Sequence, residues 1–529
     1  MLDIIFRNAR IIDGSGSPWF SAEVGVQDGK IAEVKKEITT ETREELDIGG
    51  AVLCPGFVDA HTHSDLRLFI HPDEKEKLHQ GITTALLGQD GLSVAPLDEA
   101  NKKPMMRRVS GLLGTYLDEW PWNSVADYFN SVAQTQPAVN NAMLVPHGAV
   151  RAMALGWENR PASAAELDRM KYILAEALDE GACGLSTGLI YPPGMYADRK
   201  ELVELCRTTG SKGGFFVVHM RNEGDDLLES ILEVGEICFE AGCPLHISHL
   251  KVAGKRNWGK SVNALELIEK FREQGLEVTF DQYPYTAGST MLDAVIPPRF
   301  HTGGTEHLLE ALADPAIREE IRRVQASKTD DKWENWITTC GWESIMINSV
   351  KTEKNRFAEG KTVVEIASLT GKDPLDAVCD LLVEEDDAVT MTQFYGSEED
   401  LKTIMQSPHM VLCSDAIVGG RPHPRAFGST ARFLGKYARD ERVLSLEEAI
   451  RKMTSQPCRR IGLFDRGLIR PGMTADITVF DPEKIIDRGT YADPCQHPDG
   501  IIHVAVNGVL ALKNGIPTGE RPGKVLRTS

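Results

Sequence analysis

Eight short apolar segments alternate with stretches of amphipathic helical pattern through the middle of this 529-residue chain. Buried strands that alternate with helices are typical of a parallel sheet whose strands are joined by helical crossovers. Eight such strands predict an α/β fold of the closed (β/α)8 barrel type, also called a TIM barrel. The segments are the residues around Val58 and the ranges 83–87, 142–145, 183–186, 215–218, 245–248, 278–280 and 410–413.

The two ends of the chain differ from this middle part and resemble each other. Residues 1–55 and 466–529 both read as short alternating strands broken by turns. We therefore expect one small β-sandwich built from both termini, with residues 56–465 forming the barrel; two unrelated β-extensions are the alternative. The segment 286–350 is longer than a loop between a barrel strand and its helix needs to be, so we expect an insertion there that serves as a lid.

Composition excludes several classes of protein. A formal net charge of −20 argues against a nucleic-acid-binding surface, and no apolar stretch reaches the 18 residues of a membrane helix. Residues 1–7 lack the basic and then apolar layout of a signal peptide. The ten cysteines show no paired spacing, which favours reduced thiols and a cytoplasmic location. The expected partner is a small molecule, and the oligomeric state stays open, a homo-oligomer included.

A pair of histidines, His61 and His63, follows directly after the first apolar segment. Residues two apart in a strand point to the same face, so both imidazoles can reach one cation. The carboxyl end of a barrel strand is also where barrel enzymes carry their active sites. The pair therefore predicts a metal site, although two partly buried, hydrogen-bonded histidines would give the same pattern.

Other strand ends carry further ligand types. Asp90 follows the second strand, His219 the fifth, His249 the sixth and Asp415 the eighth. With the first pair they make four histidines and two carboxylates on one rim, a set of nitrogen and oxygen donors that suits two metal ions. Each alone has an ordinary alternative, since a strand-end aspartate often caps a helix. His246 is expected to be a core histidine.

Longer motifs extend this interpretation over nearly the whole chain. They are Pro-Gly-Phe-Val-Asp-Ala-His-Thr-His at 55–63, Gly-Ile-Thr-Thr at 81–84, and the segments 91–96, 184–194, 219–221, 248–251, 281–289 and 423–428. The set resembles the amidohydrolase superfamily and, within it, the N-acyl-D-amino-acid deacylases (D-aminoacylases). The resemblance implies a metal-dependent barrel with a β-sandwich from both termini. The implied reaction is amide hydrolysis of N-acyl-D-amino acids to a carboxylate and a free D-amino acid.

The resemblance also implies roles for the strand-end residues. One metal would be held by His61, His63 and Asp415, and another by His219 and His249. Asp415 would also act as general base and acid, taking a proton from water and passing it to the leaving amine. The expected cofactor is Zn²⁺, as one or two ions, with Mn²⁺ or a similar ion as the alternative.

One position departs from the family pattern. Where these deacylases usually place a cysteine in a Gly-Asn-Cys-Gly segment, residues 88–91 read Gly-Gln-Asp-Gly. Asp90 would replace a soft thiolate with a hard carboxylate, which weakens the preference for zinc and favours ions such as manganese. Alternatively, the site holds fewer metals and Asp90 is only hydrogen-bonded.

The resemblance implies that Tyr283, Ser289 and Arg425 bind the α-carboxylate of the substrate. An arginine fork suits a planar carboxylate, and a phenol and a hydroxyl supply further donors. A surface salt bridge is the alternative for Arg425, and a core aromatic with a solvated hydroxyl is the alternative for Tyr283.

The side-chain pocket is expected to be apolar. Residues 291–298 contain no lysine or arginine, and Ile190 and Met195 can supply an apolar wall. Such a pocket favours neutral, hydrophobic side chains and penalises an unpaired charge. If Lys251 points inward, it would instead favour acidic side chains.

Two rival functions fit parts of the pattern. Cyclic-amide hydrolases such as hydantoinases and dihydropyrimidinases share the histidine pair but bridge their metals with a carboxylated lysine on a central strand. Residues 144–148 and 184–187 contain no lysine, and Lys171 lies in a helical stretch. A non-catalytic scaffold of the same fold is the second rival, but only one ligand position is altered, and that residue can still bind metal.

Overall fold

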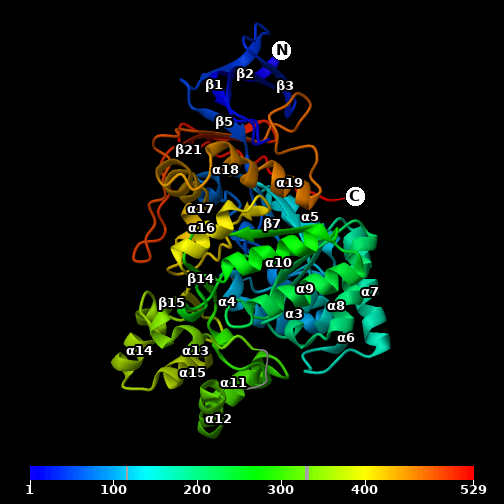
Figure 1. The fold of residues 1–529 in the computed structure, drawn as a ribbon, viewed down its shortest axis with the longest axis vertical. Coiled ribbons are helices and arrows are strands. Elements are labelled where there is room, and N and C mark those ends of the chain that lie inside the picture. Colours follow the sequence, from blue (N-terminus) through cyan, green and yellow to red (C-terminus); the bar gives the residue numbers. More distant parts are fainter. Residues whose placement is uncertain (115–116, 328–332, 529) are drawn as a thin grey trace.

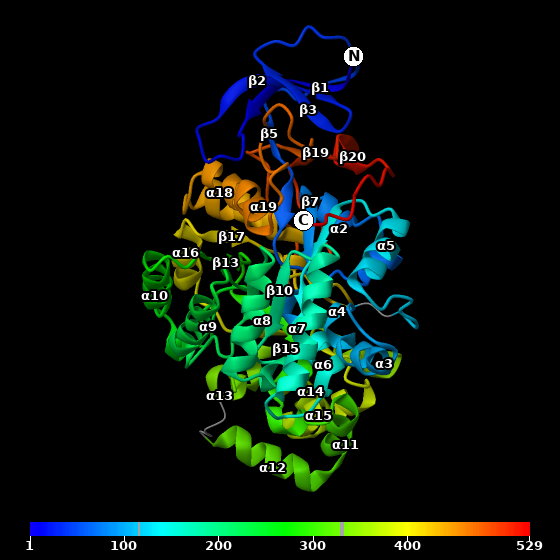
Figure 2. The same ribbon diagram turned by 90° about the vertical axis from the view of Figure 1, so that its right-hand side faces the viewer.

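The computed structural model describes residues 1–114, 117–327 and 333–528. A barrel forms the centre of the molecule (Figures 1 and 2). A sheet domain built from both chain ends (blue and red) lies at one end of the long axis, and an inserted segment (green to yellow) lies at the other.

The eight predicted barrel strands are all present among the described residues. They are β6 (Phe57–Asp59), β7 (Ile82–Leu87), β8 (Asn140–Met143), β10 (Gly184–Gly188), β11 (Phe215–His219), β12 (Leu245–Ile247), β13 (Val278–Gln282) and β17 (Met410–Leu412).

These strands pair in parallel and close into a ring. One sheet runs β6-β7-β8 and the other β17-β13-β12-β11-β10-β9, where β9 (Val145–Pro146) continues the path of β8. A parallel bridge between Thr62 and Ala416 joins the chain beyond β6 to the chain beyond β17. The (β/α)8 barrel predicted from the sequence is therefore confirmed, and all the strands end on one rim.

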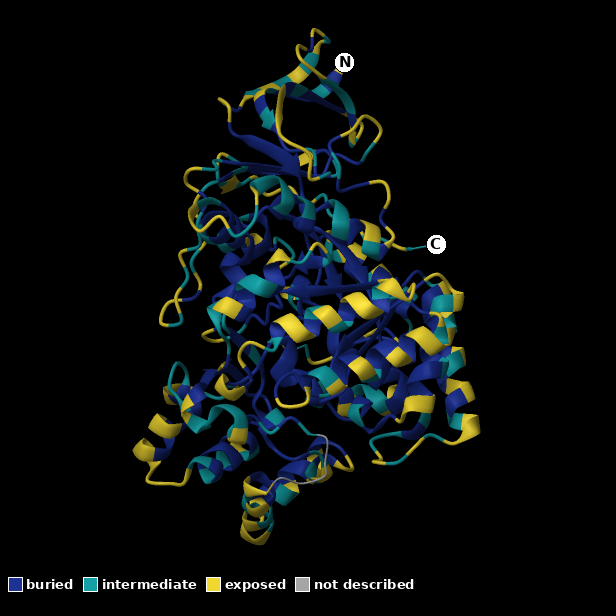
Figure 3. Ribbon diagram, in the orientation of Figure 1, coloured by how far each residue is buried: buried dark blue, intermediate teal, exposed yellow. Residues whose placement is uncertain are grey.

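Helices surround the barrel. Figure 3 shows the strands buried and the outer faces of the covering helices exposed. This is the burial pattern expected of amphipathic crossovers. The helices that surround the barrel are α3 (Glu99–Arg108), α4 (Ser110–Leu113), α5 (Val125–Thr135), α6 (His147–Leu155), α7 (Ala164–Asp179), α8 (Arg199–Ser211), α9 (Leu227–Ala241), α10 (Ser261–Glu273), α16 (Glu398–Gln406), α17 (Arg425–Arg432), α18 (Leu446–Met453) and α19 (Ser455–Ile461).

The terminal domain is assembled from both ends of the chain, as predicted, and its strands join in one hydrogen-bonded sheet around a shared apolar core. The chains meet where β5 (Val52–Pro55) pairs antiparallel with β18 (Ile477–Phe480) and parallel with β1 (Leu2–Ile11). Because β5 pairs on both sides, the two halves share one hydrogen-bonded ladder. The other strands are β2 (Phe20–Gln27), β3 (Lys30–Lys35), β4 (Thr42–Asp47), β19 (Ile501–Val506), β20 (Val509–Lys513) and β21 (Ile516–Pro517).

The inserted segment runs further than the predicted 286–350. Its antiparallel sheet, in the order β14-β16-β15, consists of β14 (Ala287–Met291), β15 (Ile345–Ser349) and β16 (Thr390–Phe394). Since β16 is the central strand, the segment is complete only near residue 394. Its helices are α11 (Thr305–Ala313), α12 (Pro315–Ala326), α13 (Trp336–Cys340), α14 (Val363–Thr370) and α15 (Pro374–Glu384).

The sequence predicts reduced cysteines and no membrane-spanning helix. All ten cysteines are free thiols. In the part of the chain that the structure describes, none of the helices combines the length and hydrophobicity that a membrane span needs.

Candidate metal centre and substrate cavity

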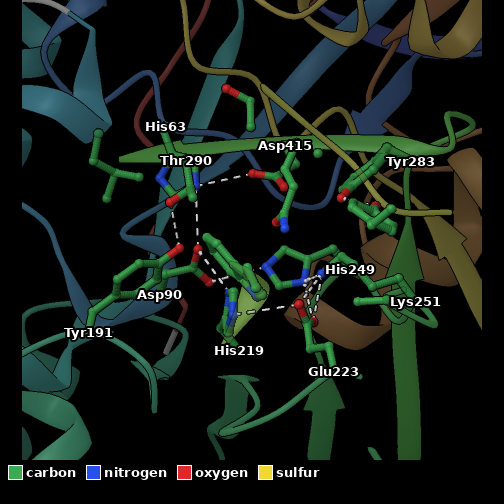
Figure 4. A pocket seen from close by; sticks show the side chains of 17 residues that line it. His63, Asp90, Tyr191, His219, Glu223, His249, Lys251, Tyr283, Thr290 and Asp415 are labelled. Atoms are coloured by element: carbon green, nitrogen blue, oxygen red, sulfur yellow. Dashed lines mark hydrogen bonds and ion pairs between the residues drawn. The ribbon is translucent and has the colours of Figure 1, made fainter. Parts of the chain in front are cut away.

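The predicted ligand residues all lie at the carboxyl ends of barrel strands, and all of them except His61 line one cavity (Figure 4). His61 lies beside them in the same cluster. His219 is the last residue of β11, and His249 follows β12. Asp90 lies in a short 3₁₀ turn, η1 (Gln89–Gly91), directly after β7. The barrel thus brings together residues that are up to 354 positions apart, His61 and Asp415, because parallel strands end on the same rim.

Asp90 is surrounded by four imidazoles. Its Oδ1 lies 3.7 Å from His61 Nε2 and 3.8 Å from His249 Nε2. Its Oδ2 lies 3.5 Å from His63 Nε2 and 3.9 Å from His219 Nδ1. Each oxygen of this carboxylate therefore faces one histidine from each of the two expected metal positions.

Asp415 completes the arrangement on the opposite side. Its Oδ1 lies 3.2 Å from His63 Nε2 and 3.7 Å from His61 Nε2. Its Oδ2 lies 2.9 Å from Nη1 of Arg425. One oxygen therefore faces the histidines and the other is held by an arginine.

These residues fit divalent cations. The imidazole nitrogens of His61 and His219 and Oδ1 of Asp90 are buried and have no hydrogen-bond partner among the described residues. Unpaired buried polar atoms of this kind are costly, by about 1–3 kcal/mol each, and metal ligation would satisfy them. Nitrogen and oxygen donors without sulfur suit zinc, manganese and similar ions. The overlapping ligand groups include His61-His63-Asp90, Asp90-His219-His249 and His61-His249-Asp415.

Three of the ligand residues have left-handed backbone conformations. The φ angles are 55° at Asp90, 34° at His249 and 49° at Asp415. Such conformations cost non-glycine residues about 1–3 kcal/mol each and persist where the surroundings fix them. The N–H of Asp415 donates to the carbonyl of His61 at 2.7 Å, and the N–H of His249 donates to Oδ1 of Asp281 at 2.6 Å. These bonds hold the strand ends in the turns that aim the side chains into the cavity.

The electrostatics keep both carboxylates ionised. Burial raises the pKa of Asp90, but the facing histidines, His61 first, outweigh it and leave the pKa well below its usual range. Burial also raises the pKa of Asp415, and the charge of Arg425 reverses the effect so that the net shift is downward. Both groups are therefore ready to bind a cation.

Sequence reasoning missed two carboxylates that support the histidines. Asp281, on β13, lies 3.6 Å from His61 Nδ1 and 2.9 Å from His246 Nε2. Glu223 lies 3.1 Å from His249 Nδ1 and 3.6 Å from His219 Nε2. A carboxylate behind a ligand histidine fixes the ring and raises its basicity. The only local signal was that Glu223 follows His219 by four residues and that Asp281 opens the motif at 281–289. His246 is buried between Thr279 and Asp281, as a core histidine.

The cavity is lined by three of the predicted substrate residues, Tyr283, Ser289 and Lys251. Three others, Arg425, Ile190 and Met195, are not among the described residues that line it. The rest of its wall is formed mainly by Leu112, Tyr191, Thr290, Trp336, Gln393 and Tyr395.

Lys251 points into the cavity but its charge is already paired. Its Nζ lies 2.6 Å from both carboxylate oxygens of Glu223 and 2.6 Å from Nδ1 of His249 (Figure 4). A lysine held in this way has little charge left for a substrate carboxylate.

Arg425 lies directly behind the cavity wall and is fully buried. Besides its ion pair with Asp415, its Nη2 donates to the carbonyl of Ser289 at 2.9 Å, and its guanidinium lies 4.4 Å from the centre of the Tyr283 ring. The Tyr283 hydroxyl is 2.5 Å from that of Tyr395. Arg425 therefore supports the two residues that line the cavity and the carboxylate of Asp415.

On the described barrel strands at the third and fourth positions, the bridging lysine of the rival hydrolases has no counterpart. Strands β9 and β10, at the third and fourth positions of the barrel, contain no lysine. The central position between the histidines is taken by Asp90 instead.

Comparisons with known proteins identify the family of the chain. The family model described as amidohydrolase family matches residues 44–511. The N-acyl-D-glutamate deacylase of Alcaligenes xylosoxydans xylosoxydans is 33% identical over 99% of this chain and 96% of its own length. The D-aminoacylase of the same organism is also 33% identical, over 99% of this chain and 97% of its own.

A solved structure of a deacylase is similar to this chain in its fold. The N-acyl-D-glutamate deacylase of Bordetella bronchiseptica, complexed with zinc and a phosphonate inhibitor, matches with a TM-score of 0.85 and 34% identity, covering all of both chains. The chain therefore belongs to the amidohydrolase family, in the branch of the N-acyl-D-amino-acid deacylases.

Proposed function

We propose that this protein hydrolyses the amide bond of N-acyl-D-amino acids in a metal-dependent reaction, releasing a carboxylate and a free D-amino acid. The observation that carries the proposal is one cavity in which a metal-fitting histidine and aspartate cluster lies beside Tyr283 and Ser289. The names of the similar enzymes, which act on N-acyl-D-glutamate and D-amino-acid derivatives, support the substrate class.

The metal would be held by the four histidines together with Asp90 and Asp415. When bound there, a divalent ion polarises the amide carbonyl and lowers the pKa of water towards neutrality. Because Asp90 faces both pairs of histidines, it would contribute hard oxygen donors beside each pair. An all-nitrogen-and-oxygen site then accepts manganese or similar ions as well as zinc.

Asp415 would move the proton. Its Oδ1 faces the cavity beside His63, while Oδ2 is fixed by Arg425. We infer that Oδ1 takes a proton from water as the bond to the carbonyl carbon forms, and then delivers it to the leaving nitrogen. Ionisation of the carboxylate by Arg425 makes it a base at neutral pH, and its fixed position supplies the orientation that proton transfer requires.

The α-carboxylate of the substrate would lie against the hydroxyls of Tyr283 and Ser289, both in the cavity wall. Arg425 supports this subsite from behind through its contacts with both residues. The guanidinium of Arg425 also forms an ion pair with Asp415. The same group therefore contacts both the proposed carboxylate subsite and the residue proposed to carry the proton.

For the side chain of the substrate we keep the preference for neutral, hydrophobic groups. The wall contains Leu112, Tyr191 and Tyr395, and Lys251, which also lines the cavity, is neutralised by Glu223. The two relatives with equal identity differ in their named substrates, so likeness alone does not decide the preference. The ten free thiols are consistent with a reducing compartment such as the cytoplasm.

The test is a product assay on matched enantiomers. Purified protein, prepared with zinc or with manganese, is incubated with N-acetyl-D- and N-acetyl-L-amino acids, and the release of free amino acid is measured. We expect release from D-substrates only, and its loss after treatment with a chelator. Activity on cyclic amides with none on linear D-substrates would instead favour the hydantoinase-type function.

A further inference from the structure

One short stretch of the inserted segment, residues 334–340, reaches the cavity. Trp336, the first residue of α13, is 6% exposed and lines the cavity wall. Asn335 caps the helix by accepting the N–H of Thr338 at 3.2 Å, and its Nδ2 donates to the carbonyl of Gln325 at 2.8 Å. The indole is therefore held at a fixed place at the cavity rather than on a free loop.

Residues 334–340 pack closely against two glycines of the barrel loops. At Gly254, which follows β12 and has a φ of 87°, an added Cβ would lie 2.1 Å from Cγ2 of Thr339. At Gly224, which follows β11, it would lie 3.3 Å from Oε1 of Glu334. The approach of α13 to the barrel at Gly254 is so close that only a residue without a side chain fits. The inserted segment is thus docked into the rim on either side of Trp336.

Glu334, the first residue of the segment 334–340, is buried. Its side chain is 3% exposed, and neither carboxylate oxygen has a hydrogen-bond partner in the part of the chain that the structure describes. Burial, together with the charge of Glu223, raises the pKa of Glu334 to about 8. The contact with Gly224 places this carboxyl group against the loop after β11, beside Glu223.

We propose that Trp336 is a specificity residue, against which an apolar group of the substrate packs, and that Glu334 is the positioning residue that seats it. This inference rests on the proposed deacylase function. Tyr283 and Ser289 are expected to take the α-carboxylate, so the groups left to meet the indole are the acyl chain and the side chain of the substrate. Both are apolar, and the experiment separates them.

The experiment compares wild type with Trp336→Ala and Trp336→Phe on two substrate series. One series lengthens the acyl chain of a single D-amino acid from acetyl to hexanoyl. The other keeps the acetyl group and enlarges the side chain from D-alanine to D-phenylalanine. Trp342→Phe is the matched control, because Trp342 belongs to the same segment but is not among the described residues that line the cavity.

We expect Trp336→Ala to lower kcat/KM about tenfold for the large members of one series, mainly through KM, and less than about threefold for N-acetyl-D-alanine. Trp336→Phe should retain most of the selectivity, and metal content should stay at the wild-type level in every variant. The series that responds identifies the group that packs on the indole. An equal loss on all substrates, or no loss on any, would overturn the assignment of Trp336.

Glu334 is tested in the same assay. Glu334→Gln copies the shape of the neutral acid and should keep the wild-type selectivity, whereas Glu334→Ala should shift selectivity in the same direction as Trp336→Ala. Wild-type selectivity in Glu334→Ala would remove the positioning role and leave that of Trp336 intact. A wild-type protein that contains metal but hydrolyses no N-acyl-D-amino acid would overturn the deacylase function and this inference with it. An active wild type with indifferent Trp336 variants would overturn this inference alone.

Discussion

Nη1 of Arg425 lies 2.9 Å from Oδ2 of Asp415, and both side chains are buried. The pair joins the residue proposed to carry the proton to the residues proposed to hold the substrate carboxylate, because the same guanidinium contacts Tyr283 and the carbonyl of Ser289. Under the proposed roles, substrate orientation and proton transfer would both depend on this single charged group.

Asp415→Asn should retain substantial metal and lose almost all turnover. The amide preserves the shape and one oxygen donor but cannot accept the proton, and general acid–base catalysis is worth roughly 10²–10⁴-fold. Metal content by elemental analysis and kcat on an N-acetyl-D-amino acid are the two measurements. A metal-loaded variant with near-normal kcat would sink the assignment of Asp415.

Arg425→Ala should lower kcat for both an N-acyl-D-amino acid and its amide, because Asp415 loses its buried partner. Loss of such a charge partner typically costs about 2–5 kcal/mol. We expect a further loss of kcat/KM for the acid alone, since Tyr283 and Ser289 lose their support. Equal losses on acid and amide would show that Arg425 acts only through Asp415 and would exclude it from the carboxylate subsite.

Asp90→Ala should lower metal affinity, because each Asp90 oxygen faces two of the histidines. Asp90→Cys should shift preference from manganese towards zinc, since a thiolate is the softer donor. Metal content and competition between the two ions are measured directly, without reference to activity. Unchanged content and selectivity in both variants would mean that Asp90 is only hydrogen-bonded.

N-acetyl-D-leucine should be hydrolysed with a higher kcat/KM than N-acetyl-D-glutamate. The reason is that Glu223 already neutralises Lys251, so a substrate carboxylate would be buried without a free partner. Glu223→Gln frees the lysine and should shift the ratio towards glutamate. A wild-type preference for glutamate would show that Lys251 reads the acidic side chain despite its pairing.

The stability of the inserted segment should depend on pH through His301. This residue is 4% exposed, and burial lowers its pKa to about 4. Because the folded pKa lies below the unfolded value, the unfolded chain binds the proton first as the pH falls from about 6.5 to about 4, and stability is lost across that window.

Between pH 7 and pH 5 the contribution of His301 should amount to a loss of about 2 kcal/mol. His301→Gln should remove that part of the pH dependence in urea unfolding, whereas His307→Gln, at an exposed position of the same segment, should not. Identical pH dependence in wild type and His301→Gln would contradict the prediction.

The barrel and the clustering of the candidate metal ligands were predictable from local sequence. Strand and helix periodicities repeat along the chain and reveal where each strand ends. Because the parallel strands of a closed barrel end on one rim, a histidine or aspartate that follows a strand is expected on that rim. This is why the strand pattern alone points to the four histidines, Asp90 and Asp415, although hundreds of residues separate them. The shared strand pattern of the two chain ends likewise predicted that they form one domain. It did not predict that β5 would pair with strands from both ends.

The tertiary structure alone decided which side chains surround those ligands. Asp281 and Glu223 support the histidines, and Lys251 is paired with Glu223. Arg425, which was expected to bind the substrate carboxylate, is buried behind the cavity wall and paired with Asp415. These outcomes depend on pairings and packing between distant segments, and no local periodicity encodes them. The sequence by itself determined the strand ends and therefore where the candidate ligands lie. The packing of the inserted segment and of the loops determined the wall of the cavity.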